Sequence, residues 1–272
     1  MRRMLYTAAA LVFGVGIPLL VLTEYTDALF AWTVQPPLTA AFLGGCYWSA
    51  GILELTAARE RYWARARVAI PGVLLFTVLT CIPTVMNFRH FNLRSPAAYA
   101  WIGVYFGVPP VLFWLWRKQL RAPGQDEPRT APMPASVRAT YASLALVLLG
   151  YGLLMFLTPS LVSGAWPWEL NPRDTAYANL ARMEPYIGVW LLGLGTIAGC
   201  AALENDLRRI KCVMAGGVAL PALQAVALAR YPSTVRWAHP ATWAFGAVLA
   251  CLLAVSIAGI ASLRRRDRSS RP

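Results

Sequence analysis

Eight long apolar runs, each bounded by charged residues or proline, divide the chain. A helix that crosses the hydrocarbon core of a bilayer needs about 20 apolar residues, and each run approaches that length. The third and seventh runs contain Pro83 and Pro221, which membrane helices tolerate when neighbouring groups bond the freed carbonyl. The predicted spans are Leu5–Thr23, Leu38–Ala57, Val68–Asn87, Ala97–Trp116, Ala139–Thr158, Glu184–Leu203, Cys212–Ala229 and Pro240–Leu263. The pattern predicts an all-α, polytopic membrane helix bundle.

The amino-acid composition also indicates a membrane protein. The 272 residues are 58% hydrophobic and 14% charged, with a mean hydropathy of +0.50, whereas soluble domains are about 25% charged. A soluble globular protein and a disordered chain are therefore both excluded.

The basic residues predict the orientation of the spans. With eight spans, all but six of the 25 basic residues fall on one side of the membrane, the side of both termini. The other side has Arg89, Arg94, Arg173, Arg182, Arg230 and Arg236. Because cytoplasmic loops are enriched in Lys and Arg, we expect both termini in the cytoplasm and the protein in the plasma (inner) membrane.

Only Lys118 and Lys211 are lysines. This preference for arginine over lysine is typical of a high-GC bacterium.

Tryptophan marks the opposite side. Six tryptophans lie at or near the predicted outer surface, where their amphipathic rings prefer the headgroup zone. We expect them to anchor the outer interface. They are Trp32, Trp101, Trp166, Trp168, Trp237 and Trp243.

The chain also matches itself when offset. A shift of 144 residues aligns Gly44 with Gly188, Glu60 with Glu204, Arg65 with Arg209, Gly72 with Gly216 and Pro96 with Pro240, and a shift of 136 aligns Gly14 with Gly150 and Gly16 with Gly152. This predicts two four-helix repeats, residues 1–120 and 139–263, joined by a flexible cytoplasmic linker at 121–138 and followed by a basic tail at 264–272. Because each half has an even number of spans, the repeats should be parallel, with a pseudo-twofold axis along the membrane normal.

Two segments of the first half resemble known sequences. The run Phe30-Ala31-Trp32, the run from Pro36 to Gly44 and the later Tyr105-Phe106-Gly107-Val108-Pro109-Pro110 are similar to a family of uncharacterised multi-pass membrane proteins from actinobacteria. The resemblance implies no activity, so no functional residue is carried over.

The formal charge of +13 has an explanation in the membrane. The basic residues follow the spans, as the cytoplasmic bias of Lys and Arg predicts, and we expect no nucleic acid as a partner. The run from Arg264 to Arg268 should attract anionic lipid. The bilayer is the expected partner, and the sequence identifies no protein partner.

Catalytic signatures are missing from the sequence. It contains no HExxH, GxSxG or CxxCH motif and no phosphate loop, the patterns of metalloproteases, serine hydrolases, c-type cytochromes and ATPases. The five cysteines form no CxxC pair and lie in or beside apolar runs, where they should act as small buried hydrophobes. We expect no catalytic residue, no metal and no cofactor.

Glu54 is the one acidic residue well inside an apolar run, near the cytoplasmic end of its span. One interpretation places it at the interface or pairs it with Arg59 or Arg61. A second makes it a proton or cation relay, because ionisable groups at membrane depth are costly and are often functional.

Four further polar residues are candidates. Glu184 opens the sixth span beside Pro185, where a carboxylate favours the positive end of the helix dipole. Gln224 lies within the seventh span. His90 and His239 lie in outer loops at nearly equivalent places in the two halves, either as surface residues or, with nearby arginines, as a site for an anionic headgroup.

Three function classes fit the sequence. The first is a carrier or permease-like protein of unknown substrate, which the repeats and the proline-interrupted third and seventh spans favour. The second is a non-catalytic scaffold or partner subunit, favoured by the scarcity of buried charge. The third is a lipid-modifying membrane enzyme, for which only His90, His239, Asp174 and Glu184 could converge. A polar cleft between the halves, with Gln224 or Glu54 in it, would favour the carrier.

Overall fold

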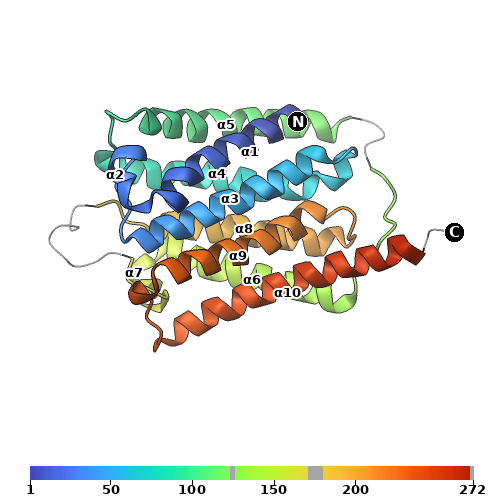
Figure 1. Cartoon of the computed structure of the whole chain (residues 1–272). Helices are drawn as coiled ribbons and strands as arrows, with labels where there is room; N and C mark the ends of the chain where they lie inside the picture. The colour runs from blue at the N-terminus through green and yellow to red at the C-terminus, as the bar shows by residue number, and fades with distance from the viewer. Residues whose placement is uncertain (123–125, 171–179, 270–272) are drawn as a thin grey trace.

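The computed structural model describes residues 1–122, 126–170 and 180–269, and within these residues eight helices are long and apolar enough to cross a membrane (Figure 1). All eight predicted spans are confirmed, including those with Pro83 and Pro221 inside the helix. The short helices α2 (Thr26–Leu29) and α7 (Pro159–Val162) lie between long ones. The long helices are α1 (Arg2–Gly16, continued by a π-helical segment, Ile17–Val21), α3 (Pro37–Arg59), α4 (Ile70–Met86), α5 (Pro96–Leu120), α6 (Ala135–Leu157), α8 (Glu184–Glu204), α9 (Lys211–Arg230) and α10 (Pro240–Ser269).

Two predicted boundaries differ from the structure. Helix α10 continues through Ser269, so the described part of the basic tail forms the last turns of that helix. Arginine is a good helix former, and no Gly or Pro interrupts residues 264–269. Helix α6 begins at Ala135, which shortens the linker between the halves.

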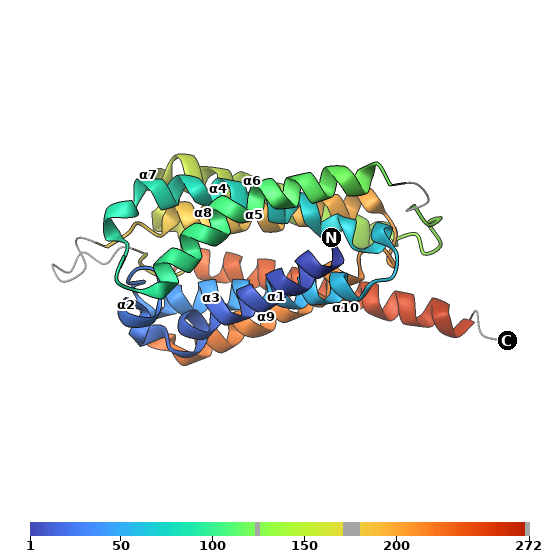
Figure 2. The ribbon, with the colours of Figure 1, turned by 90° about the horizontal axis from the view of Figure 1, so that it is seen from above.

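The helices form two layers (Figure 2). In one layer α3 packs between α1 and α9, and α10 packs on α9; in the other, α8 packs between α6 and α4, and α5 packs on α4. Each layer thus combines two helices from the first half of the chain with two from the second. The chain crosses from one layer to the other in residues 60–69, between α3 and α4, and in residues 205–210, between α8 and α9.

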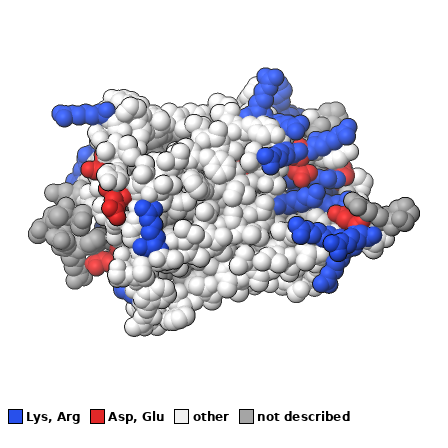
Figure 3. Space-filling model, viewed as in Figure 1, with Lys and Arg blue, Asp and Glu red and all other residues white. Residues whose placement is uncertain are grey.

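The two ends of the bundle differ in charge. On the face shown in Figure 3, a band without charged side chains crosses the middle, and Lys and Arg gather mostly at one end. The start of α1 and the end of α10 lie at that end (Figure 1), which we call the basic end. The other end, where α3, α5, α8 and α10 begin, we call the aromatic end.

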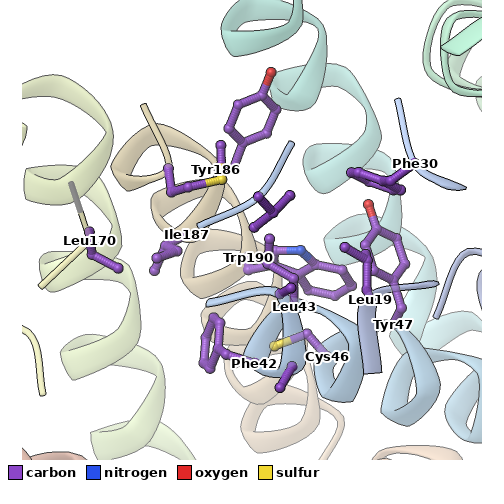
Figure 4. Packing of buried hydrophobic residues seen from close by; sticks show 14 of the residues in the cluster. Leu19, Phe30, Phe42, Leu43, Cys46, Tyr47, Leu170, Tyr186, Ile187 and Trp190 are labelled. Atoms are coloured by element: carbon purple, nitrogen blue, oxygen red, sulfur yellow. The ribbon is translucent and has the colours of Figure 1, made fainter. Parts of the chain in front are cut away.

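Buried aromatic rings join the layers at the aromatic end. Trp32 stacks on Tyr186 with centroids 5.0 Å apart and meets Trp101 edge to face at 4.7 Å. Trp190 of α8 meets Tyr47 of α3 at 4.8 Å (Figure 4). Such geometries add to the area that the rings bury.

This cluster corrects the interpretation of the tryptophans. Trp32, Trp101, Trp166 and Trp168 are buried in the protein, and only Trp237 and Trp243 of the six are exposed. The position of a tryptophan in the sequence indicates its depth along the membrane normal but not whether its ring points to the lipid or to the protein interior. In the sequence, a buried aromatic cluster therefore looks the same as an interfacial belt.

Ion pairs join the connections at the basic end. Glu204, at the end of α8, accepts hydrogen bonds from Arg67, Arg129 and Arg209. The Arg209 side chain is buried and also lies 2.9 Å from Asp126. Residues of both layer crossings and of the linker therefore share one charge network.

The described part of the linker is held in place. Arg65 donates two hydrogen bonds to the Glu127 carboxylate, at 2.7 and 2.5 Å, and Asp206 accepts one from the Ala131 amide at 2.7 Å. The sequence predicts a flexible loop here from its proline and mixed charge, but residues 126–134 carry acidic groups that meet arginines of the body.

A close contact at Gly44 generates a prediction about stability. A Cβ at Gly44 would lie 2.5 Å from the backbone nitrogen of Leu20, whereas at Gly103, also within a helix, it would meet nothing within 4 Å. Gly44→Ala should destabilise the protein by about 1–3 kcal/mol through overpacking, and Gly103→Ala should not. Thermal unfolding in detergent, followed by tryptophan fluorescence, measures both; equal melting temperatures would contradict the packing of α3 on Ile17–Val21.

The Glu127 ion pair generates a prediction about pH. The hydrogen bonds from Arg65 lower the pKa of Glu127 from its ordinary value, so the carboxylate stabilises the folded state above its unfolded pKa, and this stability is lost as pH falls through the folded pKa. Glu127→Gln should cost about 1 kcal/mol at neutral pH, and the difference from wild type should vanish in acid. Unfolding measured across pH tests this. Glu24→Gln, an exposed carboxylate at the other end, is the control, and a difference that persists in acid would contradict the assignment.

A cavity between the helix layers

A cavity of about 620 Å³ lies between the two layers, and all eight long helices contribute to its wall. Its volume is in the range of small-molecule sites. The wall is almost entirely carbon, from side chains such as Val73, Phe76, Leu194 and Leu252. An interior of this kind suits an apolar molecule or the apolar part of an amphiphile.

The two edges of the cavity differ. At one edge α6 packs on α10, and the Tyr141 hydroxyl lies 3.2 Å from Ser256 Oγ across that contact. At the other edge α1 and α5 both line the cavity but are not a closely packed pair within the described residues. The wall residues Thr7 and Leu11 on α1 are exposed. Beside α1 the wall therefore lacks the close helix–helix contact that closes the opposite edge, within the described residues.

Glu54 lines this cavity from α3. It belongs to a stripe with Cys46, Ala50 and Leu53, whose spacing of three and four residues places them on one face of the helix. The residue is only 3% exposed, and its Oε2 has no hydrogen-bond partner within the described part of the chain. A carboxyl group with an unsatisfied oxygen thus lies in an apolar chamber.

The expected pairing of Glu54 with Arg59 or Arg61 is not formed among the described residues. Arg59 follows five positions later, which at 3.6 residues per turn places it about 140° around the helix. Arg61 lies beyond the end of α3. The interfacial interpretation is also wrong, because Glu54 is buried.

Gln224 of α9 also lines the cavity and is buried. Its Nε2 donates a hydrogen bond to the Phe42 carbonyl at 3.0 Å and lies 3.7 Å from Cys46 Sγ. The amide therefore joins α9 to α3 inside one layer. Glu54 and Gln224, the two candidates whose presence in a cleft favours a carrier, share one cavity.

The other candidates lie toward the aromatic end. His239 lines the cavity beside Pro240, and its Nδ1 accepts a hydrogen bond from the Ala241 amide. His90 accepts one from Arg89 and is not part of the cavity wall. Glu184 is buried at the first position of α8, as the dipole interpretation expects.

The described segments contain no group of three or more His, Cys, Asp or Glu side chains that could bind a metal ion. Arg173 and Asp174 lie outside the described residues. Of the cysteines, Cys46 and Cys212 are buried as expected, but Cys251 is exposed on α10.

Several wall residues were not predicted from the sequence. Tyr141, Tyr105 and Trp190 contribute polar atoms or rings to the cavity, and the Tyr105 hydroxyl lies 2.5 Å from that of Tyr47. For Trp190 the sequence does contain a usable signal, because its helix α8 is rich in small residues, which favour close helix packing inside a membrane bundle.

A scan against protein-family models, a search of curated proteins and a search of solved structures each found no match. The functional interpretation therefore depends on the geometry of the chain itself.

Proposed function

We propose that this multi-pass membrane protein is a carrier-like protein that takes a hydrophobic molecule into the cavity between its two helix layers. The observation that carries the proposal is the cavity itself, an apolar chamber of about 620 Å³ within the membrane-spanning part that also contains Glu54 and Gln224. A scaffold has no need of such a chamber.

A two-repeat architecture is part of this proposal. Exchanging the halves would exchange the layers, because α1, α3, α4 and α5 would replace α6, α8, α9 and α10. Parallel repeats of this kind place binding sites at the repeat interface, which is where the cavity lies.

Reciprocal glycine contacts support the repeats. A Cβ at Gly72 of α4 would meet the Gly193 carbonyl of α8 at 2.7 Å, and one at Gly216 of α9 would meet the Ser49 carbonyl of α3 at 3.4 Å. These are the same contact with the halves exchanged, since the 144-residue offset matches Ser49 with Gly193.

A second reciprocal pair agrees. The contact of Gly44 with the Leu20 nitrogen corresponds to that of Gly188 with the Phe156 nitrogen, at 2.8 Å. Leu20 and Phe156 are related by the 136-residue offset found near the amino terminus. Both sequence offsets thus correspond to contacts in space.

We further propose that the basic end faces the cytoplasm of a bacterial cell, with the protein in the plasma membrane. The gathering of Lys and Arg there (Figure 3) supports this orientation. Arg264, Arg265 and Arg268 are exposed on the last turns of α10, where they would attract anionic headgroups.

The enzyme alternative receives less support. His239 lines the cavity, Glu184 lies at the start of α8, and His90 pairs with its neighbour Arg89. Neither His90 nor Glu184 is part of the cavity wall in the described segments, so the cavity does not gather these three residues.

Filling the cavity tests the proposed function. Ala50 lines the cavity beside Glu54, and Ala50→Phe should lower the saturable binding of radiolabelled dodecanol by at least about tenfold, because the ring would occupy the space of the ligand. Binding is measured to the protein in phosphatidylcholine nanodiscs, with empty nanodiscs subtracted. Ala247→Phe, on the exposed side of α10, should bind as wild type does. Absence of saturable binding to wild type, or unchanged binding to Ala50→Phe, would refute the proposal.

Orientation is tested with single cysteines in a background that lacks the native five. Ser233 is exposed at the aromatic end and Ser269 at the basic end. An impermeant maleimide applied to intact cells should label Ser233→Cys and not Ser269→Cys, and lysis should make both reactive. Labelling of Ser269→Cys in intact cells would reverse the assigned orientation.

A further inference from the structure

We propose that the ligand of the cavity is an amphiphilic amine, whose ammonium group is bound by the Glu54 carboxylate and whose hydrocarbon part fills the apolar chamber. This inference deepens the proposed function and rests on it. It concerns the chemical class of the ligand, an alkyl chain with a protonated amino group.

The first step is the state of the carboxyl group. Glu54 is 3% exposed, its Oε2 has no hydrogen-bond partner among the described residues, and no arginine or lysine of those residues pairs with it. Burying such a group is costly unless a partner compensates. A ligand that donates to it would supply that partner.

The second step is the chamber around the carboxyl group. Several other polar wall groups have partners inside the protein: Gln224 donates to the Phe42 carbonyl, Thr77 to the Val73 carbonyl and Ser49 to the Cys46 carbonyl. Trp166 Nε1 also lacks a partner among the described residues, but it is a donor, so Glu54 is the wall residue there with an unsatisfied buried acceptor. The site thus presents one carboxyl group with an unsatisfied oxygen in a wall of carbon.

These two properties select the ligand. An ammonium group donates charge-assisted hydrogen bonds at about 2.7–2.9 Å to a carboxylate, and the low dielectric of the chamber strengthens the attraction. A fatty acid would bring a second negative charge, and an alcohol would bring no charge. The apolar wall rejects a small hydrophilic cation, which would lose its hydration without compensation.

The experiment compares dodecylamine with dodecanol, which share one chain and differ in the head group. Both are radiolabelled and bound at neutral pH to the protein in phosphatidylcholine nanodiscs, with empty nanodiscs subtracted. Wild type should bind dodecylamine at least about tenfold more tightly than dodecanol, a ratio in keeping with a hydrogen bond to a charged group. Glu54→Gln should abolish this preference and leave dodecanol binding unchanged.

The control is Glu60→Gln, which removes a carboxylate at the end of the same helix, where it lies 3.7 Å from Arg65, and should preserve the preference. Retained dodecanol binding shows that the Glu54→Gln cavity is intact. If dodecanol binds and Ala50→Phe reduces it, but Glu54→Gln keeps the amine preference or wild type has none, the amine assignment is overturned and the carrier proposal stands. If neither probe binds wild type saturably, both fail.

Discussion

Close approach of helix backbones within each layer is the contact on which the rest of the structure depends. Lipid is as apolar as leucine, so membrane helices associate through van der Waals packing, which small residues allow. Glycines supply that contact where α3 meets α9 and where α4 meets α8. Between the layers long side chains intervene instead. The layers are therefore tightly packed units, and the cavity lies between them.

What holds the layers together differs at the two ends. At the aromatic end, stacked and edge-to-face rings such as Trp190 on Tyr47 fill the gap. At the basic end, Glu204 and its arginines join the crossings and the linker. The aromatic rings are buried and pack without solvent, whereas the ion pairs include exposed side chains such as Arg129. Each end thus uses the interaction that suits its surroundings. The cavity lies between the layers, and some of the rings, such as Trp190, form part of its wall.

The sequence predicted the eight spans because about 20 apolar residues are a physical requirement of the bilayer. The same pattern could not place Trp32 or Trp101 in the interior, since hydropathy carries depth but not direction. Glu54 stands out in the sequence as the acidic residue well inside an apolar run, but the expected interfacial position and pairing with Arg59 or Arg61 are wrong, because helix geometry turns Arg59 away and Glu54 is buried. The cavity depends on which helices are neighbours, and Tyr141 and Ser256 are 115 positions apart, a relation that no local pattern contains.

The two crossings of the chain between layers have a mechanical consequence. Both lie at the basic end, in residues 60–69 and 205–210, and both belong to the network of Arg67, Glu204 and Arg209. Covalent continuity and ion pairing thus fasten the layers at the basic end. At the aromatic end the layers are joined by ring contacts and by backbone hydrogen bonds between loops, from the Asn92 amide to the Ala31 carbonyl and from the Arg236 amide to the Pro167 carbonyl. Widening the cavity at the aromatic end would therefore break only noncovalent contacts, whereas the two chain crossings limit how far the layers can separate at the basic end.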